Sequence, residues 1–288
     1  MTEKGKRLIE NEHVAVKQCK YGTMMYNTND AFIGRSMDLY GEWCDNELDI
    51  IGQILQPGCL VVDVGANIGT HTLFFAQKVQ EEGFVLAFEP QRLSFQMLNG
   101  NVALNGITNV KTYQTAVSDK EGKIPVPVLR PTVKANYGAI SAQGHEHGEE
   151  VEVVTIDSLN LARCDLMKID VEGMETKVLK GAVKTIQAYQ PVLFVENNHQ
   201  TNSKELIETL YDLGYRCYWN IAGYYNPENF LDNEENIFEN MSPEVNMLCF
   251  PKHIEVAVHG CPEVTGSEDS WLKCIERVRE EMLVGAED

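Results

Sequence analysis

One short segment constrains the fold of this chain more than any other. An apolar run at 59–64 leads into the sequence Asp63-Val-Gly65-Ala-Asn67-Ile-Gly69, and residues 70–79 then show the apolar spacing of a helix. A second apolar run, 84–88, follows and ends at Glu89. The order strand, glycine turn, helix, strand predicts parallel strands whose carboxyl ends carry a ligand site.

The same alternation of strands and helices continues through most of the chain. We expect further strands at 110–115, 166–171, 191–195, 215–221 and 246–250, and helices at 93–104, 175–188, 203–213 and 271–283. Ser203 is the expected N-cap of its helix, and Gly214 is expected just after that helix ends. The sequence therefore predicts an α/β fold with a Rossmann-like, doubly wound sheet of about seven strands.

A proline-containing stretch at 122–155 interrupts this alternation and ends in alternating apolar residues, which predicts a β-rich insertion. We divide the chain accordingly into three parts. These are an N-terminal cap or lid segment at 1–56, a central α/β domain at 57–251 that contains the insertion, and an acidic C-terminal extension at 252–288.

The charge balance excludes two classes of partner. The chain carries 24 lysines and arginines against 43 aspartates and glutamates, a formal net charge of −19. Such a surface repels nucleic-acid phosphates and anionic lipid headgroups, so we expect neither a nucleic-acid nor a membrane partner. The sequence shows no leader pattern and no apolar stretch near the roughly 18 residues of a membrane span, so a soluble, cytoplasmic protein is expected. Eight dispersed cysteines fit reduced thiols.

The glycine turn favours a nucleoside cofactor without a pyrophosphate. The dinucleotide fingerprint G-x-G-x-x-G fails here, because Asn67 and Thr70 occupy the second and third glycine positions counted from Gly65. No lysine or arginine lies in the turn. Glu89 can accept hydrogen bonds from both ribose hydroxyls, and Asp63 can face an ammonium group of the cofactor. S-adenosylmethionine has this chemistry; alternatively, the glycines serve only the packing of strand and helix.

Three carboxylates lie close together at the end of the strand expected at 166–171. Asp170, Glu172 and Glu175 precede a helix, and like charges at this spacing raise the pKa of at least one of them. Such a cluster is expected to bind a cation, to pair with Lys168 or to transfer a proton. Alternatively, Glu172 and Glu175 only offset the helix dipole while Asp170 caps the helix.

Together with Gly41-Glu42-Trp43 upstream and Val195-Glu196-Asn197 downstream, these motifs make the chain resemble the FkbM family of S-adenosylmethionine-dependent methyltransferases over residues 34–250. The resemblance implies a seven-stranded sheet whose last strand is antiparallel, and methyl transfer to an oxygen of a sugar or natural product. It also implies a role for each matching position: Asp63, Gly65, Asn67 and Gly69 in the cofactor loop, Glu89 as the ribose carboxylate, and Asp170 with Glu172 as the motif of the fourth strand.

Chemistry and location indicate roles for these and the remaining candidates. Because an aliphatic hydroxyl is too weak an acid to ionise beforehand, we expect Asp170 to act as the general base. Glu172, Glu175 and Glu196 would shape the acceptor site or hold a divalent ion, although no metal site is assigned. Other residues are expected near the ligands: Ala116 and Val117 beside adenine, and Trp43 at the acceptor, where stacking on a substrate competes with simple packing.

Three functions follow from the sequence, in order of preference. The first is O-methylation of a hydroxyl on a glycan or small metabolite, with S-adenosylmethionine as cofactor. The second is a non-catalytic, nucleoside-binding regulatory protein on the same fold, which the intact carboxylate cluster disfavours. The third is a nicotinamide-dependent oxidoreductase, which the missing glycine fingerprint disfavours.

Overall fold

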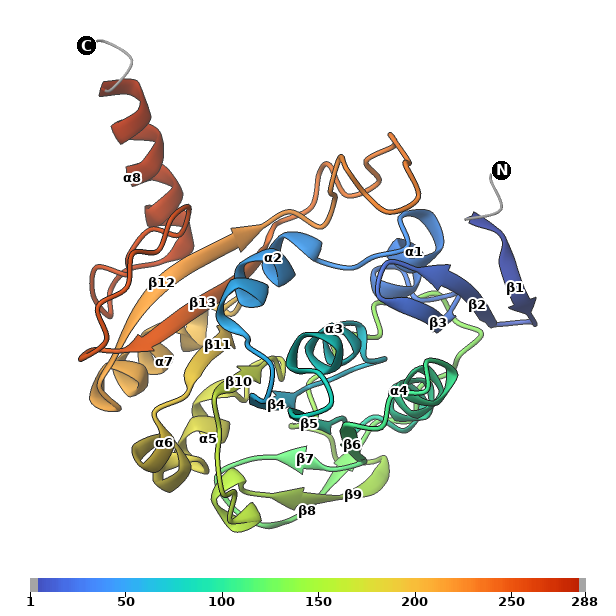
Figure 1. Ribbon diagram of the computed structural model, residues 1–288, viewed down its shortest axis with the longest axis horizontal. Helices are drawn as coiled ribbons and strands as arrows, with labels where there is room; N and C mark the ends of the chain where they lie inside the picture. The colour runs from blue at the N-terminus through green and yellow to red at the C-terminus, as the bar shows by residue number, and fades with distance from the viewer. Residues whose placement is uncertain (1–4, 285–288) are drawn as a thin grey trace.

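A seven-stranded sheet forms the centre of the computed structural model, which describes residues 5–284 (Figure 1). Residues 1–4 and 285–288, the outer ends of the predicted N-terminal cap and C-terminal extension, lie outside the described residues. The strands of this sheet lie in the order β12, β13, β11, β10, β4, β5, β6. In chain order they are β4 Leu60–Val64, β5 Phe84–Phe88, β6 Val110–Tyr113, β10 Leu166–Ile169, β11 Val192–Glu196, β12 Tyr215–Ala222 and β13 Glu244–Pro251.

Strand directions confirm the predicted fold class. β4 pairs in parallel with β5 and β10, β5 with β6, and β10 with β11. β13 is antiparallel to both of its neighbours, β11 and β12. The chain builds outward from β4 to β6 on one side of the sheet and places β10 and β11 on the other. Such a switch in strand order leaves a crevice beyond the carboxyl ends of β4 and β10.

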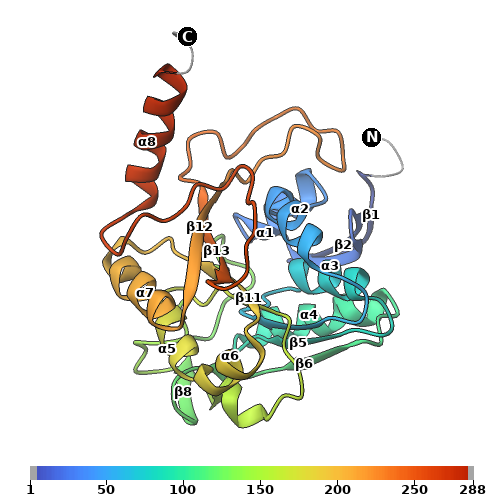
Figure 2. The same ribbon diagram turned by 60° about the vertical axis from the view of Figure 1, so that its left-hand side comes forward.

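Helices cover both faces of this sheet, and successive strand residues face opposite layers. Val61 belongs to the apolar cluster that includes α2 (Asp45–Ile54) and α3 (Thr70–Val79). Val62 belongs to the cluster on the other face, where Figure 2 shows α5 (Glu175–Lys180), α6 (Val183–Tyr189) and α7 (Gln200–Asp212). Both valines are fully buried. Burial on two faces therefore explains the continuous apolar run of β4.

The prediction of a single helix at 175–188 is wrong, because the structure has two helices there, α5 and α6. Gly181 ends α5, and its carbonyl accepts a hydrogen bond from Asp157 N (2.9 Å). A Cβ at Gly181 would lie 2.1 Å from Ser118 O, so the backbone of Ser118 approaches too closely for any side chain at this position. The helix is therefore interrupted where Gly181 meets the backbone of Ser118 and Asp157.

The expected start of the next helix also needs correction. α7 begins at Gln200 with His199 as its N-cap residue, so Ser203 lies inside the helix rather than at its cap. The expected end is confirmed, because Gly214 follows the C-cap residue Leu213 and has a φ of +86°. Glycine adopts this left-handed conformation without steric cost.

Two small sheets flank the central one. The N-terminal sheet is antiparallel and consists of β1 Arg7–Glu10, β2 Val14–Cys19 and β3 Gly22–Asn27. The second sheet has the order β7, β9, β8, with β7 Ala116–Val117, β8 Gly122–Val126 and β9 Glu149–Val154. Strands β8 and β9 of this sheet belong to the β-rich insertion that the sequence predicts at 122–155. The two remaining helices before β7 in the described part of the chain are α1 (Ile33–Leu39), which follows β3, and α4 (Arg92–Leu104), which follows β5.

The loop 223–243 between β12 and β13 reaches across to the segment that follows α1 (Figure 1). Leu231 N donates to Tyr40 O (3.1 Å), and Phe230 N donates to Glu42 Oε2 (2.9 Å). At the other end of the chain, α8 (Trp271–Val284) extends away from the body in both views. Among the described helices, none combines the length and apolar character needed to cross a membrane. All eight cysteines are buried as free thiols.

Asn101 of α4 fixes the N-terminal sheet to the central domain. Its Oδ1 accepts a hydrogen bond from Met25 N (2.6 Å), and its Nδ2 donates to Met25 O (3.0 Å) and Ile68 O (2.8 Å). Asn101 is fully buried, so Asn101→Ala leaves backbone groups without partners at about 1–3 kcal/mol each. We expect the free energy of unfolding, measured by urea titration, to fall by about 2–4 kcal/mol.

Gln96→Ala, at an exposed position of the same helix, is the matched control. Its free energy of unfolding should change by less than about 0.5 kcal/mol. Equal losses in the two variants would contradict the role given to Asn101.

Candidate functional site

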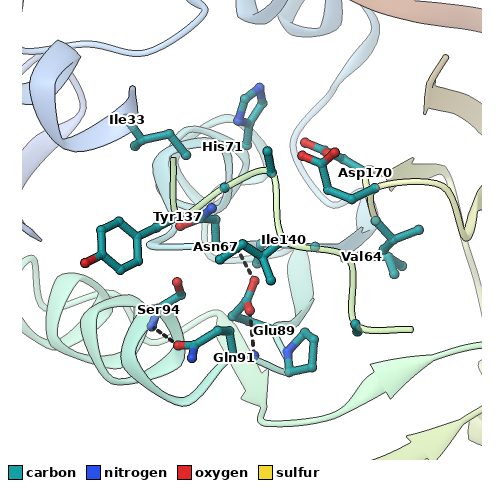
Figure 3. A pocket seen from close by; sticks show the side chains of 18 of the residues that line it. Ile33, Val64, Asn67, His71, Glu89, Gln91, Ser94, Tyr137, Ile140 and Asp170 are labelled. Atoms are coloured by element: carbon teal, nitrogen blue, oxygen red, sulfur yellow. Dashed lines mark hydrogen bonds between the residues drawn. The ribbon is translucent and has the colours of Figure 1, made fainter. Parts of the chain in front are cut away.

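A pocket lies beyond the carboxyl ends of β4, β5 and β10. It holds about 1300 Å³ of space, part of which is open to solvent. Figure 3 shows Asp170 and His71 across this pocket from Gln91 and Ser94. We call the part lined by Glu89, Gln91, Ser94, Ala116 and Val117 the Glu89 end.

The glycine turn between β4 and α3 forms one wall of the pocket. Gly65 has a φ of +83°, and a Cβ there would lie 1.7 Å from Asp170 O. Only glycine therefore lets the ends of β4 and β10 approach this closely. Gly69 serves packing instead, because its missing side chain makes room for Leu98 of α4. The turn thereby holds Asp170 beside the pocket.

Glu89 follows β5 and is held below the glycine turn. Its Oε2 accepts a hydrogen bond from Asn67 N (2.8 Å), and its Oε1 accepts one from Gln91 N (2.7 Å). The residue is 7% exposed. Burial raises the pKa of Glu89 to about 7, although both N–H groups favour its ionised form. Each carboxylate oxygen has a second lone pair, so the group can still accept hydrogen bonds from ligand hydroxyls.

A buried lysine joins two of the predicted acidic residues. The parallel register of β4 and β10 sets Lys168 directly opposite Asp63. Lys168 Nζ lies 3.0 Å from Asp170 Oδ2 and 3.8 Å from Asp63 Oδ1, and Thr72 Oγ1 donates to Asp63 Oδ2 (2.6 Å). Asp63 is fully buried and does not line the pocket. Contrary to expectation, its charge therefore meets Lys168 and does not face a ligand.

Lys168 also sets the protonation of Asp170. Burial opposes ionisation of this carboxyl, but the charge of Lys168 and its hydrogen bond outweigh burial and lower the pKa of Asp170. The pKa of Lys168 is raised, because Asp170 and Asp63 outweigh the opposing effect of burial. Both groups are therefore charged at neutral pH. The alternative that Asp170 caps the next helix is wrong, since the N-cap residue of α5 is Met174.

The other predicted carboxylates have different surroundings. Glu175 accepts hydrogen bonds from Val171 N (3.2 Å) and Gly173 N (2.9 Å), which fixes the turn before α5. Glu196 is 1% exposed and accepts a hydrogen bond from Glu172 N (3.2 Å). Of these three glutamates, only Glu172 lines the pocket. Glu175 and Glu196 therefore shape the backbone that presents Glu172.

One group of side chains has the spacing of a metal site. Single ligand atoms of Glu172, Glu196 and His199 all lie within 4.8 Å of one another. No other group of three such residues in the described part of the chain meets this criterion. The group includes two of the glutamates that the sequence analysis considers as ion ligands.

Two further acidic residues line the pocket, and the sequence analysis assigns no role to either of them. Glu47 of α2 accepts a hydrogen bond from Asn246 Nδ2 (2.8 Å), and Glu244, the first residue of β13, accepts one from Asn198 Nδ2 (2.9 Å). β13 is antiparallel to β11, so β13 begins at the edge of the sheet where the parallel strands end. An expected antiparallel last strand could therefore have pointed to Glu244 as a residue of the site. We call the part lined by Glu47, Asp170, Glu172 and Glu244 the acidic end.

Aromatic rings close the acidic end. Trp43 stacks on Tyr224 with ring centroids 5.1 Å apart, and Phe32 meets Tyr224 edge-on at 5.7 Å. These three residues line the pocket, and we call them the aromatic wall. Phe238, from the loop 223–243, packs against Tyr224 at 5.4 Å. Trp43 therefore packs in an aromatic cluster and borders the pocket, so the two roles considered for it are compatible.

Most of the predicted site residues meet in this one pocket. Those that line it are Gly65, Asn67, Glu89, Ala116, Val117, Asp170, Glu172 and Trp43. Those that lie outside the lining are Asp63, Gly69, Glu175 and Glu196. Lys168 and His71 also line it. The sequence analysis considers Lys168 only as a possible partner of the carboxylates and assigns no role to His71.

Lys168→Met tests the buried ion pairs. Without the lysine, Asp63 and Asp170 lose their cation, and the free energy of unfolding at neutral pH should fall by about 3–5 kcal/mol. The buried carboxyls should then bind protons more readily in the folded than in the unfolded state, so the loss should shrink as pH falls from about 8 to about 5. Urea titrations across this pH range provide the measurement.

Lys177→Met, on the exposed side of α5, is the control and should unfold like the wild type. A loss in Lys168→Met that grows as pH falls would contradict the ion-pair account.

The central part of the chain is similar in sequence to known methyltransferases. The sequence model described as "Methyltransferase FkbM domain" matches residues 63–217. Methyltransferase sdnD of Sordaria araneosa is 30% identical over 155 residues, which cover 42% of this chain and 59% of that protein. The 31-O-demethyl-FK506 methyltransferase FkbM of Streptomyces tacrolimicus is 31% identical over 163 residues, which cover 45% and 62%. The hexuronic acid methyltransferase AglP of Haloferax volcanii is 29% identical over 188 residues, which cover 62% and 71%.

The match to sdnD thus spans only 59% of that relative's length. Among solved structures, the methyltransferase FkbM from Methylobacillus flagellatus aligns with a TM-score of 0.43 and 15% identity, covering 70% of this chain and 50% of that chain. A S-adenosylmethionine-dependent methyltransferase from Aquifex aeolicus aligns with a TM-score of 0.38 and 15% identity, covering 75% and 91%. Because the family match covers more than half of the chain and contains both motifs that build the pocket, the protein belongs to the FkbM methyltransferase family.

Proposed function

We propose that this protein transfers a methyl group from S-adenosylmethionine to a hydroxyl group of a small-molecule or glycan acceptor. One observation carries the proposal: a single pocket holds the buried Glu89 at one end and the ionised Asp170 at the other. Relatives named as a 31-O-demethyl-FK506 methyltransferase and a hexuronic acid methyltransferase support methyl transfer.

The residues of the pocket fit this cofactor. The Glu89 end offers a carboxylate to ribose hydroxyls and small, uncharged residues to adenine. Lys168 is the only lysine or arginine among the described residues of the lining, and it already pairs with Asp170 and Asp63. A pyrophosphate would therefore meet no free cation, which disfavours a nicotinamide dinucleotide. A sulfonium group at the acidic end would meet negative charge.

In this proposal Asp170 receives the proton of the acceptor. When bound, S-adenosylmethionine supplies an electrophilic methyl group on a positively charged sulfur. The acceptor oxygen would bond to the methyl carbon as the carbon–sulfur bond breaks, and that electron pair would stay on sulfur. Asp170 takes the proton that the oxygen loses. Its low pKa suffices, because the oxygen becomes strongly acidic as the new bond forms, and Lys168 keeps the carboxylate ionised.

Selection of the acceptor is assigned to segments outside the strand ends. Phe32, Trp43 and Glu47 come from the predicted cap segment 1–56, and Tyr224 comes from the loop 223–243. These residues surround the side of the pocket opposite Glu89. The division of the chain into 1–56, 57–251 and 252–288 stays a prediction.

Cofactor affinity tests the Glu89 end. Glu89→Gln replaces one acceptor oxygen by a donor, so binding of S-adenosylhomocysteine, measured by calorimetry, should weaken by about tenfold or more. In the wild type, ligand hydroxyls favour the ionised carboxylate. Affinity should therefore rise as pH increases through the pKa of Glu89, about 7. The Gln variant should lack this dependence.

Glu82→Gln, at an exposed position near β5, should bind like the wild type. If Glu89→Gln and the wild type bound S-adenosylhomocysteine equally well from about pH 6 to pH 8, the assignment of Glu89 to the cofactor site would be contradicted.

Turnover tests the acidic end. Asp170→Asn keeps the size of the side chain and removes its charge, so methyl transfer from radiolabelled S-adenosylmethionine should fall by about 100-fold or more. A fractionated metabolite and glycan extract serves as the source of acceptor. Affinity for S-adenosylhomocysteine should stay within about threefold, because the general base acts on the acceptor.

Asp212→Asn, exposed on α7, is the matched control for a surface carboxylate. Undiminished turnover in Asp170→Asn would overturn its assignment as general base. A wild type that binds S-adenosylhomocysteine and methylates nothing in the extract would favour the non-catalytic alternative.

A further inference from the structure

We propose that the methyl acceptor carries an ammonium group in addition to its hydroxyl, and that this cation lies between the acidic end and the aromatic wall. The inference rests on the proposed function and names its class of substrate. Amino sugars and amino alcohols have this chemistry, whereas neutral sugars and uronic acids lack it.

Carboxyl groups outnumber basic groups at the acidic end. Its four carboxyl groups share one lysine, because Lys168 is the only lysine or arginine lining the pocket within the described residues. Lys168 Nζ is already occupied by Asp170 at 3.0 Å and Asp63 at 3.8 Å. The sulfonium of the cofactor would add one positive charge. No lysine or arginine of the described lining is therefore left to pair with the glutamates of the acidic end.

The pKa values of these glutamates are raised, as expected for buried carboxyl groups with no lysine or arginine partner in the described lining. Burial, together with the negative charge of Asp170, raises the pKa of Glu47 to about 8, that of Glu244 to about 8 and that of Glu172 to about 9. At neutral pH all three hold their protons as long as no cation is near. An ammonium would allow them to ionise and would be attracted by each of them in a partly desolvated site.

His71 gives a second, independent indication of a ligand that donates hydrogen bonds. It lines the pocket, is 6% exposed, and its Nε2 makes no hydrogen bond, although Glu47 Oε2 lies 3.5 Å away. Burial and the charge of Lys168 lower the pKa of His71 to about 4, so the ring is neutral at physiological pH. With the ring proton on Nδ1, 3.4 Å from Thr70 Oγ1, the Nε2 lone pair can accept a hydrogen bond from an ammonium.

The aromatic wall favours an organic cation over a neutral acceptor. Trp43 and Tyr224 are stacked on each other, and both border the pocket beside the acidic end. The faces of such rings attract ammonium groups and cover the apolar part of the same ligand. An anionic acceptor would instead meet the carboxyl groups of the acidic end.

A divalent metal ion fits this end less well. The one metal-spaced group in the described part of the chain, Glu172, Glu196 and His199, includes neither Glu47 nor Glu244. The side chain of His199 is also 44% exposed. A metal at that point would leave Glu47 and Glu244 without a cation, and it would make no use of the aromatic wall.

Three probes that differ in one group test the proposal on the protein saturated with S-adenosylhomocysteine. Benzylamine carries an ammonium, benzyl alcohol is neutral and benzoate is anionic. Calorimetry or ligand-observed NMR should show benzylamine binding at least about tenfold more tightly than benzyl alcohol, and benzoate more weakly than either. Glu47→Gln and Glu244→Gln should each weaken benzylamine binding by about threefold or more and leave benzyl alcohol unchanged.

Glu121→Gln, at an exposed position before β8, is the control and should bind all three probes like the wild type. Benzylamine that binds no better than benzyl alcohol, including no measurable binding of either, would overturn the proposal. So would Mn²⁺ that displaces benzylamine from the pocket. Binding of S-adenosylhomocysteine is measured first and separately, so failure of the cofactor assignment is distinguishable from failure of the ammonium site.

Discussion

The contact of Lys168 with Asp63 and Asp170 is the interaction on which the site depends. It lies between the parallel strands β4 and β10, where the chain switches from adding strands on one side of β4 to adding them on the other. The lysine is 3% exposed. Charges buried this deeply are tolerated only when each has a partner. The lysine thereby joins the strand that leads into the glycine turn to the strand that ends at Asp170. It also keeps Asp170 ionised inside a pocket whose other acids are mostly protonated.

Two ends of one pocket divide the work that methyl transfer requires. At the Glu89 end, two backbone N–H groups fix a carboxylate that can bind a ribose. At the acidic end, several carboxyl groups, a neutral histidine and three aromatic rings surround the side on which an acceptor would lie. Under the proposed function, the carboxyl groups that suit a sulfonium would also select among acceptors. The net charge of the chain thus matters most where a few of its acids are buried together.

The parts of the site that follow chain order could be predicted from the sequence, and the parts that depend on distant segments could not. Asp63, Glu89 and Asp170 each stand at the end of an apolar run, and parallel strands bring such ends to one edge. The contact between Asp63 and Lys168 depends on strand register, so the sequence pattern alone assigns Asp63 to a ligand. Glu47 and Tyr224 reach the pocket from a helix and a loop. Tyr224 is held there by stacking on Trp43, and Glu47 by a hydrogen bond from Asn246 of β13, and both contacts join segments far apart in the chain.

The central claim is that the pocket holds S-adenosylmethionine rather than a dinucleotide. Parallel calorimetric titrations of the wild-type protein with S-adenosylhomocysteine and with NAD test this claim most directly. We expect one molecule of S-adenosylhomocysteine to bind each chain and NAD to give no heat of binding, because the single lysine of the pocket is already paired. Heat from NAD and none from S-adenosylhomocysteine would contradict the account.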